Sequence, residues 1–216
     1  MKKLKVDGIF FDLDGTIVDS REAYYEAAEI AFHRIGQKLP EKNVIFDIPR
    51  KLEKSQSISD VIKGDLSEFL GAYFNAYYSL TMEKTKPLRN IASTLETLSA
   101  KAKFALVTMR AFPKENIIKE LEKFNIAKYF TLVVTGLDTE EPKPSPEALI
   151  KCVNVLNVRM CNCIIVGDSI SDVRAGKAAG SKTVAVLSGL FSYQELLEEN
   201  PDLIIEDVNS LPNFIE

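Results

Sequence analysis

Short apolar runs alternate along most of this 216-residue chain with longer stretches whose apolar residues recur at helical spacing. A continuous apolar run is typical of a strand with both faces covered, and repeated strand–helix units build a parallel sheet. We therefore predict an α/β fold. The predicted strands are 9–13, 104–108, 131–135, 163–167, 183–187 and 203–205, and the predicted helices are 91–101, 114–124, 146–156, 172–179 and 193–199.

The segment from about residue 21 to residue 86 breaks this alternation, because it carries no strong strand signal. Its helical patterns lie at 24–35, 60–63 and 66–78. Since it directly follows the first predicted strand, we expect an inserted helical domain whose two linkers act as a hinge. The expected parts are a core of 1–17 with 87–216, an insertion of 18–86, and linkers near 16–20 and 84–87.

Composition excludes several classes of partner. The net charge of −4 argues against a nucleic acid or an anionic membrane surface as the main partner. The first apolar run is short and is broken by Asp7 and Asp12, so we predict neither a signal peptide nor a membrane span. The three cysteines, Cys152, Cys161 and Cys163, include no Cys-x-x-Cys pair. We therefore expect a cytoplasmic protein without disulfides.

Two acids follow the first predicted strand directly. Side chains alternate along a strand, so Asp12 and Asp14 point the same way if the strand continues through Leu13, and Gly15 then permits a sharp turn. Two carboxylates held so close need a cation or a shared proton. The alternative is a strand end whose acids face water.

Three further strand ends carry polar residues, and ligands of an open parallel sheet bind at these ends. Thr108 follows the second core strand, Lys143 lies among prolines after the third, and Asp168 and Asp172 follow the fourth. Each has an ordinary explanation by itself: a strand end, a solvated lysine, or helix caps. Together we expect them to converge on one cleft, where acids, Mg²⁺ and a lysine bind a phosphate.

These residues match four motifs of a known family in order, so that the chain resembles the haloacid dehalogenase-like (HAD) hydrolases across essentially its whole length. The motifs are 12–16, Thr108, Lys143 with its prolines, and 167–169 with Asp172. The resemblance implies a Rossmann-like parallel sheet core with a helical cap inserted after the first motif. This arrangement is most similar to that of phosphoglycolate phosphatase and β-phosphoglucomutase relatives.

The resemblance also implies a metal site. In the family, Mg²⁺ is bound by the equivalents of Asp12, the backbone carbonyl of Asp14, and Asp168. Asp172 is then either a ligand through water or a residue that orients Lys143. Three carboxylates outnumber one lysine, so Mg²⁺ would bring the charge of the site near zero and allow an anionic substrate to approach.

The expected reaction is hydrolysis of a phosphate monoester in two steps. Asp12 would attack phosphorus to give an aspartyl-phosphate, and Asp14 would donate a proton to the leaving alkoxide and then take one from water. Thr108, the backbone N–H of Met109 and Lys143 would hold the transferring oxygens. Dehalogenases of the family lack the second acid, because a halide needs no proton, so Asp14 favours phosphoryl chemistry.

Two alternatives remain open from the sequence, a sugar-phosphate mutase of the same superfamily and a non-catalytic binding protein on this fold. The expected substrate is a small phosphorylated metabolite, and the sequence does not define an oligomeric state. Arg50 and Lys51, in the insertion, are candidates for specificity, although they equally suit a solvated loop. If they face the site, the substrate carries a second anionic group, as phosphoglycolate does.

Overall fold

The structure is a computed structural model that describes residues 3–216. It divides into two compact units, each continuous in space. Unit one contains the chain up to Val18 together with Pro87–Glu216, and unit two is Asp19–Lys86. The helical insertion after the first strand is therefore present, as the sequence predicted.

Unit one is built on a six-stranded sheet with the order β5-β4-β1-β6-β7-β8, in which all neighbours are parallel. The strands are β1 (Gly8–Phe11), β4 (Lys103–Val107), β5 (Phe130–Val134), β6 (Cys163–Gly167), β7 (Lys182–Val186) and β8 (Leu203–Ile205). In sequence order this is the doubly wound arrangement, whose direction reverses between β1 and β6. The α/β prediction is confirmed.

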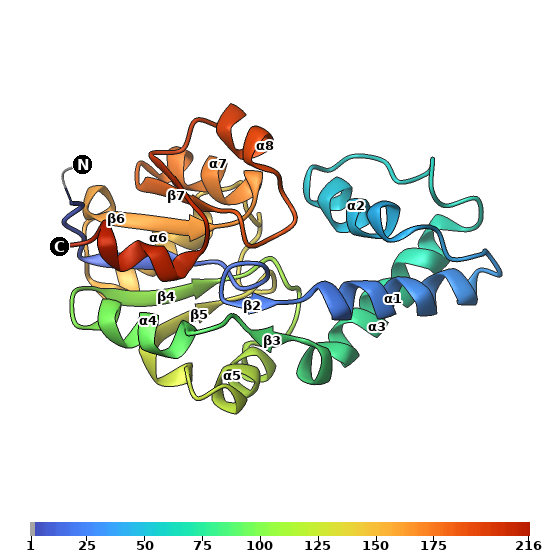
Figure 1. Cartoon of the computed structure of the whole chain (residues 1–216), viewed down its shortest axis with the longest axis horizontal. Helices are drawn as coiled ribbons and strands as arrows, with labels where there is room; N and C mark the ends of the chain where they lie inside the picture. Colours follow the sequence, from blue (N-terminus) through green and yellow to red (C-terminus); the bar gives the residue numbers. More distant parts are fainter. Residues whose placement is uncertain (1–2) are drawn as a thin grey trace. The chain divides into compact units, whose positions relative to one another are not determined.

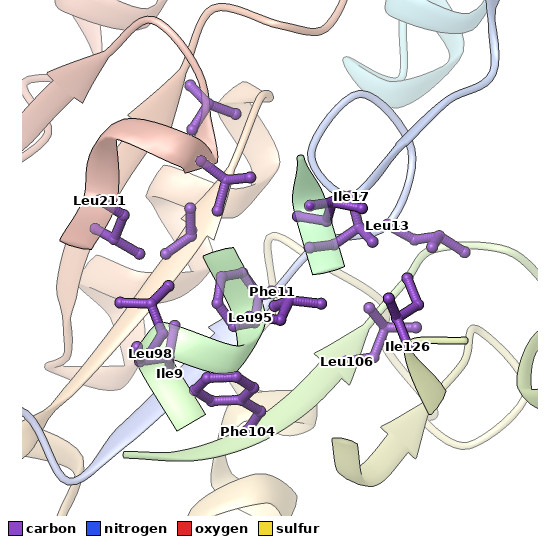
Figure 2. Packing of buried hydrophobic residues seen from close by; sticks show 14 of the residues in the cluster. Ile9, Phe11, Leu13, Ile17, Leu95, Leu98, Phe104, Leu106, Ile126 and Leu211 are labelled. Atoms are coloured by element: carbon purple, nitrogen blue, oxygen red, sulfur yellow. The ribbon is translucent and has the colours of Figure 1, made fainter. Parts of the chain in front are cut away.

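Helices cover both faces of this sheet (Figure 1). The helices of unit one are α4 (Ile91–Ser99), α5 (Lys114–Lys123), α6 (Glu147–Leu156), α7 (Ile170–Ala179) and α8 (Tyr193–Glu198), with 3₁₀ turns η1 (Ala127–Tyr129), η2 (Met160–Asn162) and η3 (Val208–Asn213). Alternate residues of β1 serve the two layers, because Ile9 and Phe11 pack with α4 and α5 whereas Phe10 packs with α6. Figure 2 shows Phe11 and Phe104 beside Leu95 of α4.

Unit two consists of α1 (Arg21–Arg34), α2 (Lys42–Glu53) and α3 (Leu66–Lys84), which share a separate hydrophobic core. Alanines of α1 lie against the aromatic residues Phe69, Tyr73 and Tyr77 of α3. The helix predicted at 60–63 is wrong, since these residues form a turn and a loop. Helix α2 is not among the predicted helices; it contains Pro49 and so lacks one internal backbone donor.

Two short strands, β2 (Val18–Asp19) and β3 (Lys86–Pro87), pair as a separate two-stranded sheet where the chain crosses between the units. Within residues 3–216, no helix has the length and apolar character needed to span a bilayer.

Candidate active site

The candidate site lies at the carboxyl ends of the two strands between which the sheet order reverses. Phe11, the last residue of β1, pairs in register with Val166 of β6, so that Asp12 and Asp168 follow neighbouring strand ends, offset by one position. The N–H of Asp12 continues this pairing by donating to the carbonyl of Val166 at 2.9 Å. Ligands of doubly wound folds bind at this switch point, and here it presents acidic side chains.

The side chain of Lys143 contacts residues from three elements: the loop after β1, strand β4 and helix α7. Its Nζ donates to Asp12 Oδ1 at 2.7 Å, to Asp172 Oδ1 at 2.6 Å and to the carbonyl of Val107 at 3.0 Å, so all three ammonium protons have acceptors. The residue is only 3% exposed. Burial disfavours its charged form, but Asp12 and Asp172 outweigh this effect and raise the pKa of Lys143.

Asp12 is a strongly perturbed acid at this site. Burial raises its pKa to about 8; Lys143 opposes the rise, while Asp172 and Asp14 add to it. One lysine thus does not compensate the carboxylates gathered around it. The site as these residues build it favours an additional positive charge.

Asp172 divides its two oxygens between two tasks. Oδ1 accepts from Lys143, and Oδ2 accepts from the N–H and the hydroxyl of Ser169, at 3.2 and 2.6 Å. Ser169 in return caps the N–H of Asp172, which completes a capping box at the start of α7. Asp172 therefore takes part in the helix cap and also contacts Lys143, and its role at the site stays a prediction. A Cβ on Gly167 would overlap the carboxyl group of Asp172, so glycine is required there.

A hydroxyl group and a backbone N–H donate to the carboxylate of Asp168. The hydroxyl of Thr16 donates to Oδ1 at 3.5 Å, and the N–H of Leu190 donates to Oδ2 at 3.2 Å. Gly15, at φ +80°, and Gly189 leave room for the carboxyl group, because a Cβ on either would overlap it. The loop after β1 and the loop after β7 thus both approach this carboxylate closely.

The residues present fit a hard divalent cation. Asp12, Asp168 and Asp172 each offer one carboxylate oxygen, and these oxygens lie within 4.8 Å of one another. All three side chains belong to buried residues. Oxygen ligands of this kind, gathered at one point and only partly neutralised by a lysine, are those that Mg²⁺ and Ca²⁺ prefer. Of the predicted ligands, Asp12 and Asp168 lie in this cluster.

Asp14 lies in a different environment from the one predicted. Strand β1 ends at Phe11, because the carbonyl of Leu13 accepts the N–H groups of Thr16, Ile17 and Val18 and so closes a turn. The expectation that the strand continues through Leu13 is therefore wrong, and simple alternation does not determine the direction of Asp14. Its carboxylate is instead bound by Arg110, whose Nε and Nη2 donate to Oδ2 and Oδ1 at 2.8 and 2.6 Å.

Arg110 is a residue that the sequence analysis missed. Its guanidinium also contacts Glu120 of α5, with Nη1 donating to Oε2 at 2.6 Å. Both side chains are almost fully buried. A signal was present in the sequence, since Glu120 lies three residues after Ile117 on the buried face of α5 and a carboxylate there requires a partner.

The residues expected to hold phosphate oxygens lie beside Lys143. Thr108 and Met109 follow β4 directly, and Lys143 reaches the carbonyl of Val107, the residue before them. The hydroxyl of Thr108 accepts the N–H of Arg110 at 3.2 Å, and Met109 Sδ lies 3.5 Å from the hydroxyl of Ser171 on α7. Loops after β4, β5 and β6 thus meet, as the sequence predicted for strand ends in one sheet.

Arg50 and Lys51 lie in unit two, in the last turn of α2, and not in a loop. Arg50 Nη1 lies 2.9 Å from Asp47, and Lys51 Nζ lies 2.6 Å from Asp60. Each of these basic groups therefore has an acidic neighbour in its own unit. Their contact with a substrate stays a prediction.

Comparisons with known proteins agree with this architecture. The model of the haloacid dehalogenase-like hydrolase family matches residues 9–186. A phosphoglycolate phosphatase from Aquifex aeolicus (strain VF5) is 32% identical over 214 residues and is matched over 96% of both chains. The phosphoglycolate phosphatase of Escherichia coli (strain K12) is 30% identical over 234 residues, which cover 95% of this chain and 91% of that protein.

Among solved structures, a haloacid dehalogenase-like family hydrolase from Streptococcus pneumoniae superposes with a TM-score of 0.81 at 21% sequence identity, over 97% of this chain and 98% of that chain. This likeness shows the same fold. The family match covers residues of β1, β4, β5, β6 and β7 and all the motifs of the site, and the identity to curated relatives extends over nearly the whole chain. The chain therefore belongs to the haloacid dehalogenase-like hydrolases, as its sequence predicted.

Proposed function

We propose that this protein is a Mg²⁺-dependent phosphatase that hydrolyses a small phosphate monoester through an aspartyl-phosphate. The observation that carries the proposal is the position of Lys143 between Asp12 and Asp172, at 2.7 and 2.6 Å, beside Asp168. Three carboxylates and one lysine repel an anion by themselves, but with a divalent cation they bind one. The relatives named phosphoglycolate phosphatase support this chemistry.

Asp12 is the proposed nucleophile. Its Oδ1 is bound by Lys143, which leaves Oδ2 for the attack on phosphorus in line with the leaving oxygen. The attack forms an oxygen–phosphorus bond to Asp12 and breaks the ester bond to the alkoxide. Water then attacks the same phosphorus and releases phosphate from Asp12.

Asp14 is the proposed acid and base. It donates a proton to the leaving alkoxide in the first step and takes one from water in the second. Lys143, the hydroxyl of Thr108 and the N–H of Met109 hold the transferring oxygens, because positive charge and N–H or O–H donors stabilise the charge that develops on them.

Asp12, Asp168 and the backbone carbonyl of Asp14 are the proposed ligands of Mg²⁺, and Asp172 orients Lys143. When bound, the cation neutralises substrate charge and polarises a phosphoryl oxygen. We further propose that residues 1–17 and 87–216 carry the chemistry and that 18–86 act as a cap, which excludes water from the first step.

The proposed substrate carries a second anionic group, as phosphoglycolate does, and Arg50 and Lys51 recognise it. With the double variant Arg50→Ala/Lys51→Ala, we expect KM to rise for phosphoglycolate and to stay unchanged for p-nitrophenyl phosphate, which lacks that group. Arg34→Ala is the matched control, because Arg34 forms an exposed ion pair with Glu68 in the same unit. An unchanged KM for every anionic substrate would refute the assignment.

The test of the reaction is phosphate release from a panel of monoesters, including phosphoglycolate, sugar phosphates and nucleotides, with Mg²⁺ and after its removal by EDTA. We expect release that stops on chelation, returns with added Mg²⁺, and is absent from the nearly isosteric Asp12→Asn variant at unchanged thermal stability. Release by Asp12→Asn near the wild-type rate would refute the covalent mechanism. Absence of release from all esters, with a phosphorylated Asp12 that can be trapped, would favour a mutase instead.

A further inference from the structure

Arg110 connects Asp14 to the interior of the protein. Its guanidinium directs two N–H groups at Asp14, at 2.8 and 2.6 Å, and two at Glu120, at 2.6 and 3.5 Å. The side chain of Arg110 is 2% exposed and that of Glu120 is 1% exposed. The carboxylate of Asp14 is thus the outer end of a buried chain of charges that begins on α5.

A buried arrangement of this kind is costly and needs a reason. An ion pair removed from water gains little over well-packed apolar side chains, because desolvation offsets the attraction. One buried guanidinium here contacts two carboxyl groups, which is more than a simple ion pair requires. Glu120 occupies the face of α5 that otherwise presents Ile117 and Leu121 to the core.

The geometry excludes a direct role for Arg110 in binding a substrate anion. Four of its five N–H groups are already directed at two carboxylates, and water has almost no access to the side chain. What the guanidinium does fix is the plane of the Asp14 carboxyl group, because a planar fork that contacts both oxygens prevents rotation about the last side-chain bond.

The backbone of Arg110 is equally constrained. Its N–H donates to the hydroxyl of Thr108, and its carbonyl accepts the N–H of Gly136 at 2.9 Å, in the loop after β5. A Cβ on Gly136 would lie 2.8 Å from the carbonyl of Met109, so the two loops approach too closely for any other residue without rearrangement. The backbone of Arg110 is therefore held in place as firmly as its guanidinium group.

We propose that Arg110 is a positioning residue that holds the carboxyl group of Asp14 in the orientation for proton transfer, and that Glu120 holds Arg110. This inference rests on the proposed function, in which Asp14 serves the leaving group. A carboxyl group has about four lone-pair sites, and Arg110 contacts one on each oxygen of Asp14; in the proposed reaction another of these sites carries the exchanged proton.

The leaving group provides the test. An alkoxide needs a proton as the ester bond breaks, whereas p-nitrophenolate leaves without one. Two esters are therefore compared: phosphoglycolate, which is an alkyl phosphate, and p-nitrophenyl phosphate. The variants are Arg110→Lys, which retains the charge but not the fork, and Arg110→Gln/Glu120→Gln, which leaves no unpaired buried charge between them. Arg174→Gln/Glu199→Gln is the matched control at an exposed Arg–Glu pair.

For the double variant at residues 110 and 120, we expect kcat on the alkyl ester to fall at least about tenfold more than kcat on p-nitrophenyl phosphate, with KM unchanged, since general acid catalysis contributes about 10²- to 10⁴-fold. For Arg110→Lys, the ratio of kcat on the alkyl ester to kcat on p-nitrophenyl phosphate should lie between that of the double variant and that of the wild type. The control should have the wild-type kcat on both esters. If the double variant does not fold, the same ratio measured on Arg110→Lys decides.

Equal losses of kcat on the two esters, or no loss, would overturn the inference while leaving the phosphatase intact. A higher kcat on the alkyl ester would also overturn it, because the fork would then restrain Asp14 from its task. If the wild-type protein releases no phosphate from phosphoglycolate, an alkyl ester of the panel that it does hydrolyse takes its place; release from no ester of the panel would overturn the proposed function, and this inference with it. The three failures are thus separated by the wild-type rate and by the ratio between esters.

Discussion

Among residues 3–216, unit one contains two buried basic side chains, each between two carboxylates, and they differ in what surrounds them. Lys143 lies between Asp12 and Asp172. Arg110 lies between Asp14 and Glu120. Two acids that are two residues apart in the sequence thus belong to two separate charge networks. Asp12 and Asp14 can therefore have different roles although they belong to one motif, because Lys143 binds the first and Arg110 binds the second.

The chemistry of the two cations matches this division. The ammonium group of Lys143 donates only to Oδ1 of Asp12 and to Oδ1 of Asp172. Asp12 is also close enough to Asp168 and Asp172 to share a metal ion with them. The guanidinium of Arg110 takes both oxygens of Asp14. A point charge leaves its partner an oxygen for bond formation, whereas a planar fork fixes orientation.

The largest effect should follow from removing Lys143. Lys143→Gln leaves Asp12 and Asp172 buried without their cation, so we expect loss of turnover on alkyl and nitrophenyl esters alike and a fall in the free energy of unfolding of about 3–5 kcal/mol. Activity assays and urea unfolding measure the two effects. Added Mg²⁺ should restore part of the stability and none of the turnover.

If the two networks are separate, the loss of turnover on replacing Lys143 should not depend on the leaving group, whereas the loss on replacing Arg110 should. A loss at Lys143 that depended on the leaving group, in the way expected for Arg110, would show that the networks act as one. The Asp12→Asn variant is the control for stability, because it removes charge at the same place while retaining the shape of the side chain.

A smaller effect is expected at Arg110, and it should depend on Glu120. Arg110→Gln leaves one buried and one partly exposed carboxylate, with an expected cost of about 3 kcal/mol in the free energy of unfolding. Arg110→Gln/Glu120→Gln should cost less than the single variant, because it leaves a single carboxylate of the trio and that one is partly exposed. Urea unfolding of the two single variants and the double variant gives the coupling. Costs that simply add would contradict a shared network.

The network around Lys143 was predictable from sequence, whereas for the network around Arg110 the sequence indicated only that Glu120 needs a partner. Strand ends are recognised from apolar runs, and parallel strands bring their carboxyl ends together, so Asp12, Asp168 and Lys143 were expected to meet. The partner of Asp14 depends on how α5 packs. Arg110 is 96 residues from Asp14, and no local periodicity reports that distance.

Turns and prolines account for the other differences. Strand β1 ends two residues before the predicted end, because the carbonyl of Leu13 accepts three N–H groups in a turn. An apolar pattern does not reveal such a turn. Helix α2 was missed because Pro49 lies inside it, and a proline there argues for a helix end. The helix predicted at 60–63 is wrong because so few residues cannot define a period.

The smallest effect should follow from removing an ion pair of the same chemistry at the surface. Arg174 contacts both oxygens of Glu199, at 2.9 and 2.6 Å, as Arg110 contacts both oxygens of Asp14, but its side chain is 57% exposed. Water and salt screen this pair, so Arg174→Gln should change the free energy of unfolding by about 0.2–1 kcal/mol and leave kcat unchanged for every ester. The small change should also fade as salt is added, whereas that of Arg110→Gln should persist, because a buried pair is poorly screened. Equal salt dependence in urea unfolding of the two variants would mean that geometry alone, and not burial, distinguishes the fork on Asp14 from an ordinary surface contact.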